Sequence, residues 1–185
     1  VRDVIKEGGK LPLEIGLIRF GADAKPIASP RLIEDTSLDA LLDSTAFESL
    51  GATNHLAALC SGWAMATGEN PPASSNCPPV GSLSTSSANN SDLYLVVITD
   101  GLPSTPMGGQ APVSDSIPSA TECLARDYQL DPNSSDPDEY LCALATTWKV
   151  LNQHTAVELI VIGLDETGTM WSISEPYWKT ITRCG

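Results

Sequence analysis

Two short segments of this sequence carry oxygen ligands of the kind that bind a hard cation. One is "GATN", residues 51–54, where Thr53 offers a hydroxyl; the other is "TDG", residues 99–101, where Asp100 offers a carboxylate. Mg²⁺, Mn²⁺ and Ca²⁺ prefer carboxylate, hydroxyl and water oxygens. One hydroxyl and one carboxylate are too few for tight binding, so such a site needs further ligands. The alternative is that Asp100 only caps a turn in which Gly101 takes a positive φ.

The strands that would position these segments are visible as apolar patterns. Residues 93–99 and 157–163 are near-continuous apolar runs, which is typical of parallel strands covered on both faces. Residues 13–20 alternate between apolar and polar types and end at Gly21, so they predict a third strand. Ligands of parallel sheets bind beyond the carboxyl ends of the strands, and Asp100 follows such an end.

Helical segments separate the predicted strands. Thr53 or Asn54 is expected to cap a helix that Gly68 ends. Residues 138–153 predict a second, amphipathic helix, and Ser174 is expected to cap a last one. Strands that alternate with helices predict an α/β fold with a doubly wound, mainly parallel, Rossmann-like sheet.

Two long polar segments interrupt this pattern, at about 69–91 and 103–137. Their Pro, Ser and Asn residues cannot bury a core, so we interpret them as loop inserts, the second with one short helix at about 119–128. Residues 24–35 contain two prolines and predict an edge hairpin. The whole of 1–185 is expected to form a single domain that is incomplete at both ends.

The five cysteines predict disulfides rather than a zinc site, because none lies in a C-x-x-C pair. Cys60 could pair with Cys77 across the first insert, and Cys123 with Cys142 around the second. Each bridge would restrain a segment with little core of its own, by ~3 kcal/mol. Cys60 could instead be a buried thiol, and Cys184 is left for a partner outside this sequence. Disulfides would place the protein in an extracellular, cell-surface or periplasmic compartment.

Charge and missing motifs exclude several classes of function. The chain has 10 Lys and Arg against 23 Asp and Glu, a net charge of −13, which does not suit nucleic-acid binding. No run approaches the ~20 apolar residues of a membrane span. There is no G-x-S-x-G elbow and no Walker loop, and His55 and His154 are isolated, expected at helix ends or on the surface. The sequence therefore predicts no enzyme.

At "LGATNHLAAL" and "LVVITDGLPS" the chain resembles a von Willebrand factor A domain. "LEIGLIRFG" and "VELIVIGLD" resemble core strands of that family, and the resemblance covers most of the chain outside the two inserts. It implies a doubly wound α/β sheet with a metal-ion-dependent adhesion site at its top. Thr53 and Asp100 would be ligands of Mg²⁺, or of Mn²⁺ or Ca²⁺. Asn54 and Gly101 would lie at the contact with a protein ligand, whose acidic residue completes the coordination.

The sequence departs from the family in one element of that site. The family carries a D-x-S-x-S loop before the strand that 13–20 resembles. The closest string here, "DTSLD" at 35–39, lies on the wrong side of that strand and ends in Asp39. Metal binding by this fragment is therefore expected to be weak or absent. The alternative hypothesis is a metal-independent structural or assembly domain that contacts neighbouring subunits of a surface or pilus-type complex.

Overall fold

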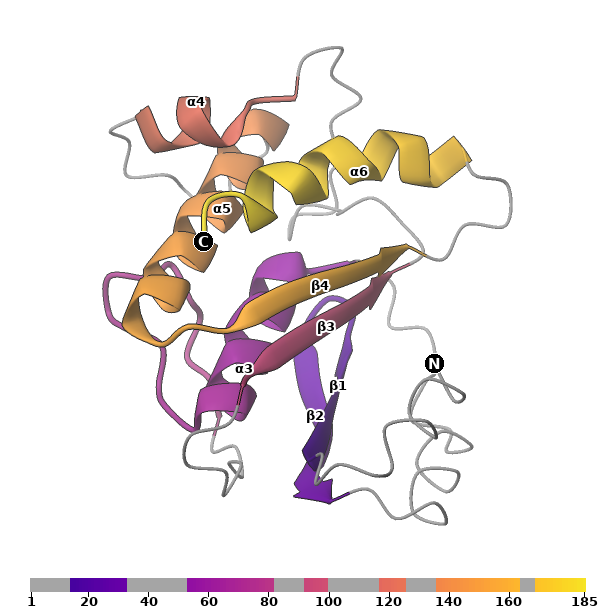
Figure 1. Cartoon of the computed structure of the whole chain (residues 1–185), viewed down its shortest axis with the longest axis vertical. Coiled ribbons are helices and arrows are strands. Elements are labelled where there is room, and N and C mark those ends of the chain that lie inside the picture. Colours follow the sequence, from indigo (N-terminus) through magenta and orange to yellow (C-terminus); the bar gives the residue numbers. More distant parts are fainter. Residues whose placement is uncertain (1–13, 33–52, 82–91, 100–116, 126–135, 164–168) are drawn as a thin grey trace.

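The computed structural model of the protein describes six stretches of the chain, drawn in colour in Figure 1: residues 14–32, 53–81, 92–99, 117–125, 136–163 and 169–185. Strands and helices alternate in it, which confirms an α/β fold. The elements are, in order, β1 (Glu14–Phe20), β2 (Ala24–Leu32), α3 (His55–Thr67), β3 (Tyr94–Thr99), α4 (Ala120–Ala125), α5 (Pro137–His154), β4 (Glu158–Gly163) and α6 (Thr169–Thr182).

The strands form two small sheets. β3 and β4 pair in parallel, with Tyr94 opposite Glu158 and Thr99 opposite Gly163, as the two apolar runs predict. β1 pairs antiparallel with β2. The prediction that residues 24–35 form a hairpin of their own is wrong, because 24–32 is a single strand, β2, and the hairpin joins it to β1. The described strands do not join into the single sheet that we expected, because β1 is not hydrogen-bonded to β3 or β4. An alternating pattern specifies which face of a strand is buried, but it does not specify its neighbour.

Helix α3 packs on both sheets and runs opposite to β1. His55 at the start of α3 contacts Phe20 at the end of β1, with ring centroids 5.7 Å apart. Near the end of α3, Met65 lies so close to Gly16 of β1 that a side chain at Gly16 would collide with it. One turn earlier on α3, Gly62 lies so close to Leu95 of β3 that a side chain at Gly62 would collide with it. Figure 1 accordingly shows β1, β3 and β4 pointing to the same end of the molecule.

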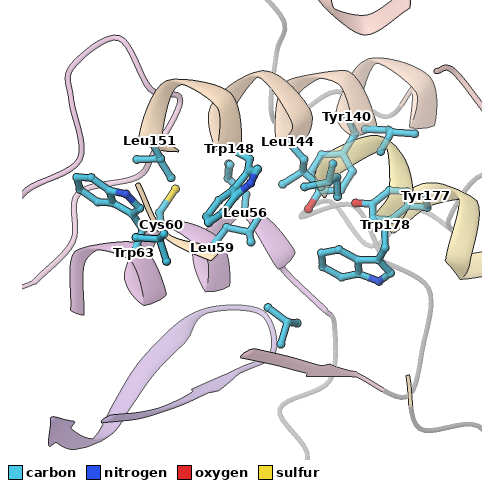
Figure 2. Close-up of a cluster of buried hydrophobic side chains, with 14 of the residues drawn as sticks. Leu56, Leu59, Cys60, Trp63, Tyr140, Leu144, Trp148, Leu151, Tyr177 and Trp178 are labelled. Atoms are coloured by element: carbon cyan, nitrogen blue, oxygen red, sulfur yellow. The ribbon is translucent and has the colours of Figure 1, made fainter. Parts of the chain in front are cut away.

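The core lies where α3 meets α5 and α6 (Figure 2). α3 and α5 run side by side in the same direction, so that Trp63 lies near Leu151 and the start of each helix lies near α6. Near the other ends of α3 and α5, the indole Nε1–H of Trp63 donates to the carbonyl of Thr155 over 3.0 Å. The large buried side chains of this core are Leu56, Leu59, Trp63, Tyr140, Leu141, Leu144, Trp148, Leu151, Tyr177, Trp178 and Ile181.

Among the residues that the structure describes, the core covers one face of the β3–β4 sheet. Val97 on the inner face is buried and belongs to the core. Tyr94, Val96, Ile160 and Ile162 on the outer face are 50, 47, 39 and 39% exposed. The expectation that both faces of these strands are covered is therefore met on the inner face alone.

The helix ends follow the predicted signals, with one exception. Asn54 caps α3, and Gly68 ends it with φ of 76°. α6 begins at Thr169, so the prediction that Ser174 caps it is wrong and Pro176 lies inside the helix. Tertiary packing outweighs the local proline signal here, since Tyr177, Trp178 and Ile181 are buried in the core. Among the helices of the described ranges, none combines the length and apolar character that crossing a bilayer requires.

Both predicted disulfides are present. Cys60 is bonded to Cys77, with Cα atoms 5.6 Å apart, and Cys123 to Cys142, with Cα atoms 4.8 Å apart. The alternative of a free thiol at Cys60 is wrong. The first bond holds the beginning of the first insert against α3, where Cys77 packs on the core. The second bond attaches the short helix α4 to α5.

Replacing Cys60 and Cys77 together by alanine is expected to lower the free energy of unfolding by about 3 kcal/mol, because the unfolded chain regains the freedom of a loop of this length. The two cysteines are 17 positions apart. Equilibrium urea denaturation measures the change. Cys184→Ala, which removes a buried sulfur but no bond, is the matched control and should lose clearly less. A double variant as stable as the parent would show that the bond does not restrain the fold.

Candidate functional site

The loop that enters α3 is held at the carboxyl end of β1 by Asn54. The backbone N–H of Asn54 donates to the carbonyl of Gly21 over 2.6 Å, and its side-chain Nδ2 donates to the carbonyl of Ala22 over 3.2 Å. The Oδ1 of the same side chain accepts from the N–H of Ala57 over 3.0 Å and so caps the helix. The amide nitrogen and the amide oxygen of Asn54 are therefore both engaged within the protein, and together they position the neighbouring Thr53. Contact of Asn54 with a partner stays a prediction.

The second predicted ligand belongs to the loop that follows β3. β3 ends at Thr99, which is buried, and β1 and β3 point to the same end of the molecule (Figure 1). Thr53, which is partly buried, lies at that end because Asn54 is bonded to the residues after β1. Asp100 and Gly101 lie outside the described residues, so the proximity of Asp100 to Thr53 stays a prediction.

The donors in the described ranges fit only part of a metal site. In these ranges no three side chains of His, Cys, Asp and Glu come together in a way that could hold a metal ion. Thr53 offers a hydroxyl, and one hydroxyl cannot hold a divalent cation. The N-terminus of α3 carries a partial positive charge, which favours an anion over a cation. The described residues therefore do not make up a metal site by themselves, and binding of a metal by Thr53 and Asp100 stays a prediction.

His55, two residues after Thr53, is part of the core. Its ring packs against Phe20, Tyr177 and Trp178, with the centroid of Trp178 at 4.7 Å. Within the described part of the chain, neither ring nitrogen has a hydrogen-bond partner. Burial lowers the pKa of His55 to about 3, so the ring is neutral. The expectation that His55 lies at the surface or serves as a cap is wrong.

The sequence contained a signal for this burial. Residues 55–67, "HLAALCSGWAMAT", include no charged residue. A helix without a polar face is buried on all sides, and a histidine at its start is then buried with it. The structure confirms this, since every residue of α3 from His55 to Met65 is buried.

Two tyrosines extend the buried polar groups around His55. The hydroxyls of Tyr140 and Tyr177 are turned towards the same part of the core (Figure 2). Burial raises the pKa of Tyr140 to about 12, and the backbone of Leu56 and His55 at the start of α3 partly offsets that shift. Burial also raises the pKa of Tyr177. The start of α3 therefore packs on uncharged aromatic rings on its inner side.

Comparison with known proteins leaves the family open. The chain matches no family model, no curated protein and no solved structure. The resemblance to a von Willebrand factor A domain accordingly rests on the two motifs and on the order of the elements.

Asn54→Ala is expected to lower the free energy of unfolding by about 1–2 kcal/mol, because it removes the helix cap. Asn54→Asp keeps an oxygen that can accept from Ala57 but loses the donor to Ala22, so it should lose less. Chemical denaturation of both variants separates the cap from the contact with the β1 end. Equal losses in the two variants would contradict the importance of the cap.

The stability of the protein is expected to fall as the pH drops below 6.5, the ordinary pKa of histidine. From there down to about pH 3 the unfolded chain binds a proton at His55 and the folded protein does not. The slope from this one group is at most about 1.4 kcal/mol per pH unit. Urea denaturation at several pH values between 6.5 and 5 measures it.

His55→Phe should remove this part of the pH dependence. His154→Gln, which removes the exposed histidine instead, is the matched control. Parent protein and His55→Phe variant with the same slope would show that His55 takes up its proton while folded.

Proposed function

We propose that this protein is an extracytoplasmic adhesion or protein-binding module that holds an acidic residue of a protein ligand through a divalent cation. The observation that carries the proposal is the position of the Thr53 loop. Asn54 fixes this loop to the residues after β1, at the end of the molecule where β3 also ends. A loop hydroxyl and a carboxylate that follows a parallel strand are suitable ligands for Mg²⁺, Mn²⁺ or Ca²⁺.

In this proposal each of four residues has a defined role. Thr53 and Asp100 hold the cation, directly or through water, and Asn54 keeps the Thr53 loop in place. Gly101 allows the chain to turn directly after Asp100. The bound cation supplies the positive charge that attracts the partner's carboxylate, and the N-terminus of α3 favours the same group.

The finer fold belongs to the same proposal. We infer a doubly wound sheet of the von Willebrand factor A type, in which a further strand joins the two small sheets. Two features support it: α3 lies against both β1 and β3, with a glycine at each contact (Gly16 of β1 and Gly62 of α3), and β1, β3 and β4 run in one direction. Such a sheet would be continuous beneath α3.

The disulfides support an extracytoplasmic location. Two disulfide bonds, Cys60–Cys77 and Cys123–Cys142, are typical of proteins in oxidising surroundings. With 23 acidic residues against 10 basic ones, the surface suits a protein ligand far better than nucleic acid.

A second candidate function is a metal-independent assembly domain, and the outer face of the β3–β4 sheet favours it. Tyr94, Val96, Ile160 and Ile162 expose a contiguous apolar surface there. Parallel sheets are usually covered on both faces, and exposed apolar patches mark contact sites. In an assembly domain, a neighbouring subunit would cover this face.

Isothermal titration calorimetry with Mg²⁺ and Mn²⁺ tests the first function. We expect weak binding, because Thr53 and Asp100 alone are too few ligands for a tight site. Asp100→Ala should abolish this binding and leave the thermal unfolding temperature unchanged. Asp92→Ala removes an exposed carboxylate at the opposite end of β3 and is the matched control.

Partner binding distinguishes the two functions. Under the first, EDTA should abolish it and Mg²⁺ should restore it. Equal binding in EDTA and in Mg²⁺ would overturn the cation mechanism and favour the assembly domain.

A further inference from the structure

Three cysteines share one buried cluster beside α4. Cys184, whose side chain is 7% exposed, packs in the same cluster as the disulfide-bonded Cys123 and Cys142. The other members, Ala143 and Ala145, are small. Cys184 is the one free cysteine in the described part of the chain. A thiolate that reaches a disulfide sulfur exchanges with it, so a free cysteine in the same cluster as a disulfide is a candidate for exchange.

The contacts of Cys184 bring it to the α4 side of that disulfide. Its Sγ lies 4.0 Å from the carbonyl oxygen of Ala120, which is one helical turn before Cys123 on α4. The end of α6 is also held next to α4 by Thr180, whose hydroxyl donates to the carbonyl of Pro118 over 2.8 Å. The Sγ of Cys184 therefore lies beside α4, one helical turn from the position of Cys123.

The surroundings of Cys184 decide when it can react. Burial raises the pKa of its thiol, and the ammonium group of Lys149 on α5 partly opposes that shift. The one charged residue of α4 is Glu122, whose carboxylate accepts from the N–H of Ser119 over 2.7 Å. Only the thiolate attacks a disulfide, so the reaction should be slow at neutral pH and faster in mild alkali.

We propose that Cys184 exchanges with the Cys123–Cys142 disulfide and so forms a second covalent state of the protein. The Cys184 thiolate attacks Sγ of Cys123, the Cys184–Cys123 bond forms, and the Cys123–Cys142 bond breaks. Cys142 leaves as a thiolate and takes up the proton that Cys184 lost. One disulfide and one thiol are present before and after, so no oxidant or reductant is needed.

The exchange changes which helix α4 is attached to. In the state described here, the bond links α4 to α5. After exchange it links α4 to the end of α6, and Cys142 on α5 becomes the free thiol. The same three helices stay together in both states, because Thr180 and the alanines of the cluster still join them.

Peptide mapping of the protein without reductant tests this proposal. The oxidised protein is incubated at pH 8.5, alkylated with N-ethylmaleimide in acid-quenched denaturant, and digested with trypsin and Asp-N. Cleavage after Arg126, Lys149 and Arg183 and before Asp92 puts the three cysteines on separate peptides. The expected products are a Cys123–Cys184 disulfide and alkylated Cys142, both increasing with time and with pH.

Two controls make the result decisive. Cys184→Ser should yield only the Cys123–Cys142 bond. The Cys60–Cys77 bond of the same molecule should stay intact, because exchange through unfolding would scramble it as well. If Cys184 alone is alkylated at every time point, or if the new bond appears only together with scrambling of Cys60–Cys77, the proposal is overturned.

Discussion

The complete burial of α3 is the constraint on which the rest of the structure depends. No side chain of this helix carries a charge, and from His55 to Met65 every residue is buried between the sheets and α5. Close approach is possible because Gly16 and Gly62 lack side chains at the two contacts with the strands. Packing of the helix on all sides fixes its start, and Asn54 joins that start to the residues after β1. The position of Thr53 is thus a consequence of packing far from it.

Much of this arrangement could be predicted from local patterns. The apolar runs of β3 and β4 are long enough to identify buried parallel strands, and Asn54 and Gly68 mark the ends of α3 by their own backbone chemistry. The partner of β1 could not be predicted, because the choice of a neighbouring strand depends on the whole chain. The start of α6 was missed for a similar reason. Burial of the residues after Pro176 stabilises a helix that the proline alone would not allow to begin so early.

The candidate site, too, could be predicted from the sequence only in part. Residue types alone identified Thr53 and Asp100 as possible ligands, because oxygen ligands in loops have a recognisable chemistry. The role of Asn54 needed the structure, since its contact with Ala22 joins positions 32 residues apart. His55 was misjudged because a single histidine was considered without the uncharged helix that follows it. His55 thus belongs to the packed core beneath the Thr53 loop and is not one of the candidate ligands.

The disulfides explain how this core tolerates long polar segments. A segment rich in Ser, Asn and Pro gains little free energy from burial and would otherwise be free to leave the surface. Cys77 attaches one such segment to α3, the most buried helix, and Cys123 attaches the six-residue helix α4 to α5. In each case the partner cysteine, Cys60 or Cys142, is fully buried on a long helix. Each disulfide therefore has one cysteine on a helix that packing already fixes. Through that cysteine it holds the residues around Cys77 or Cys123, which bury little apolar surface of their own.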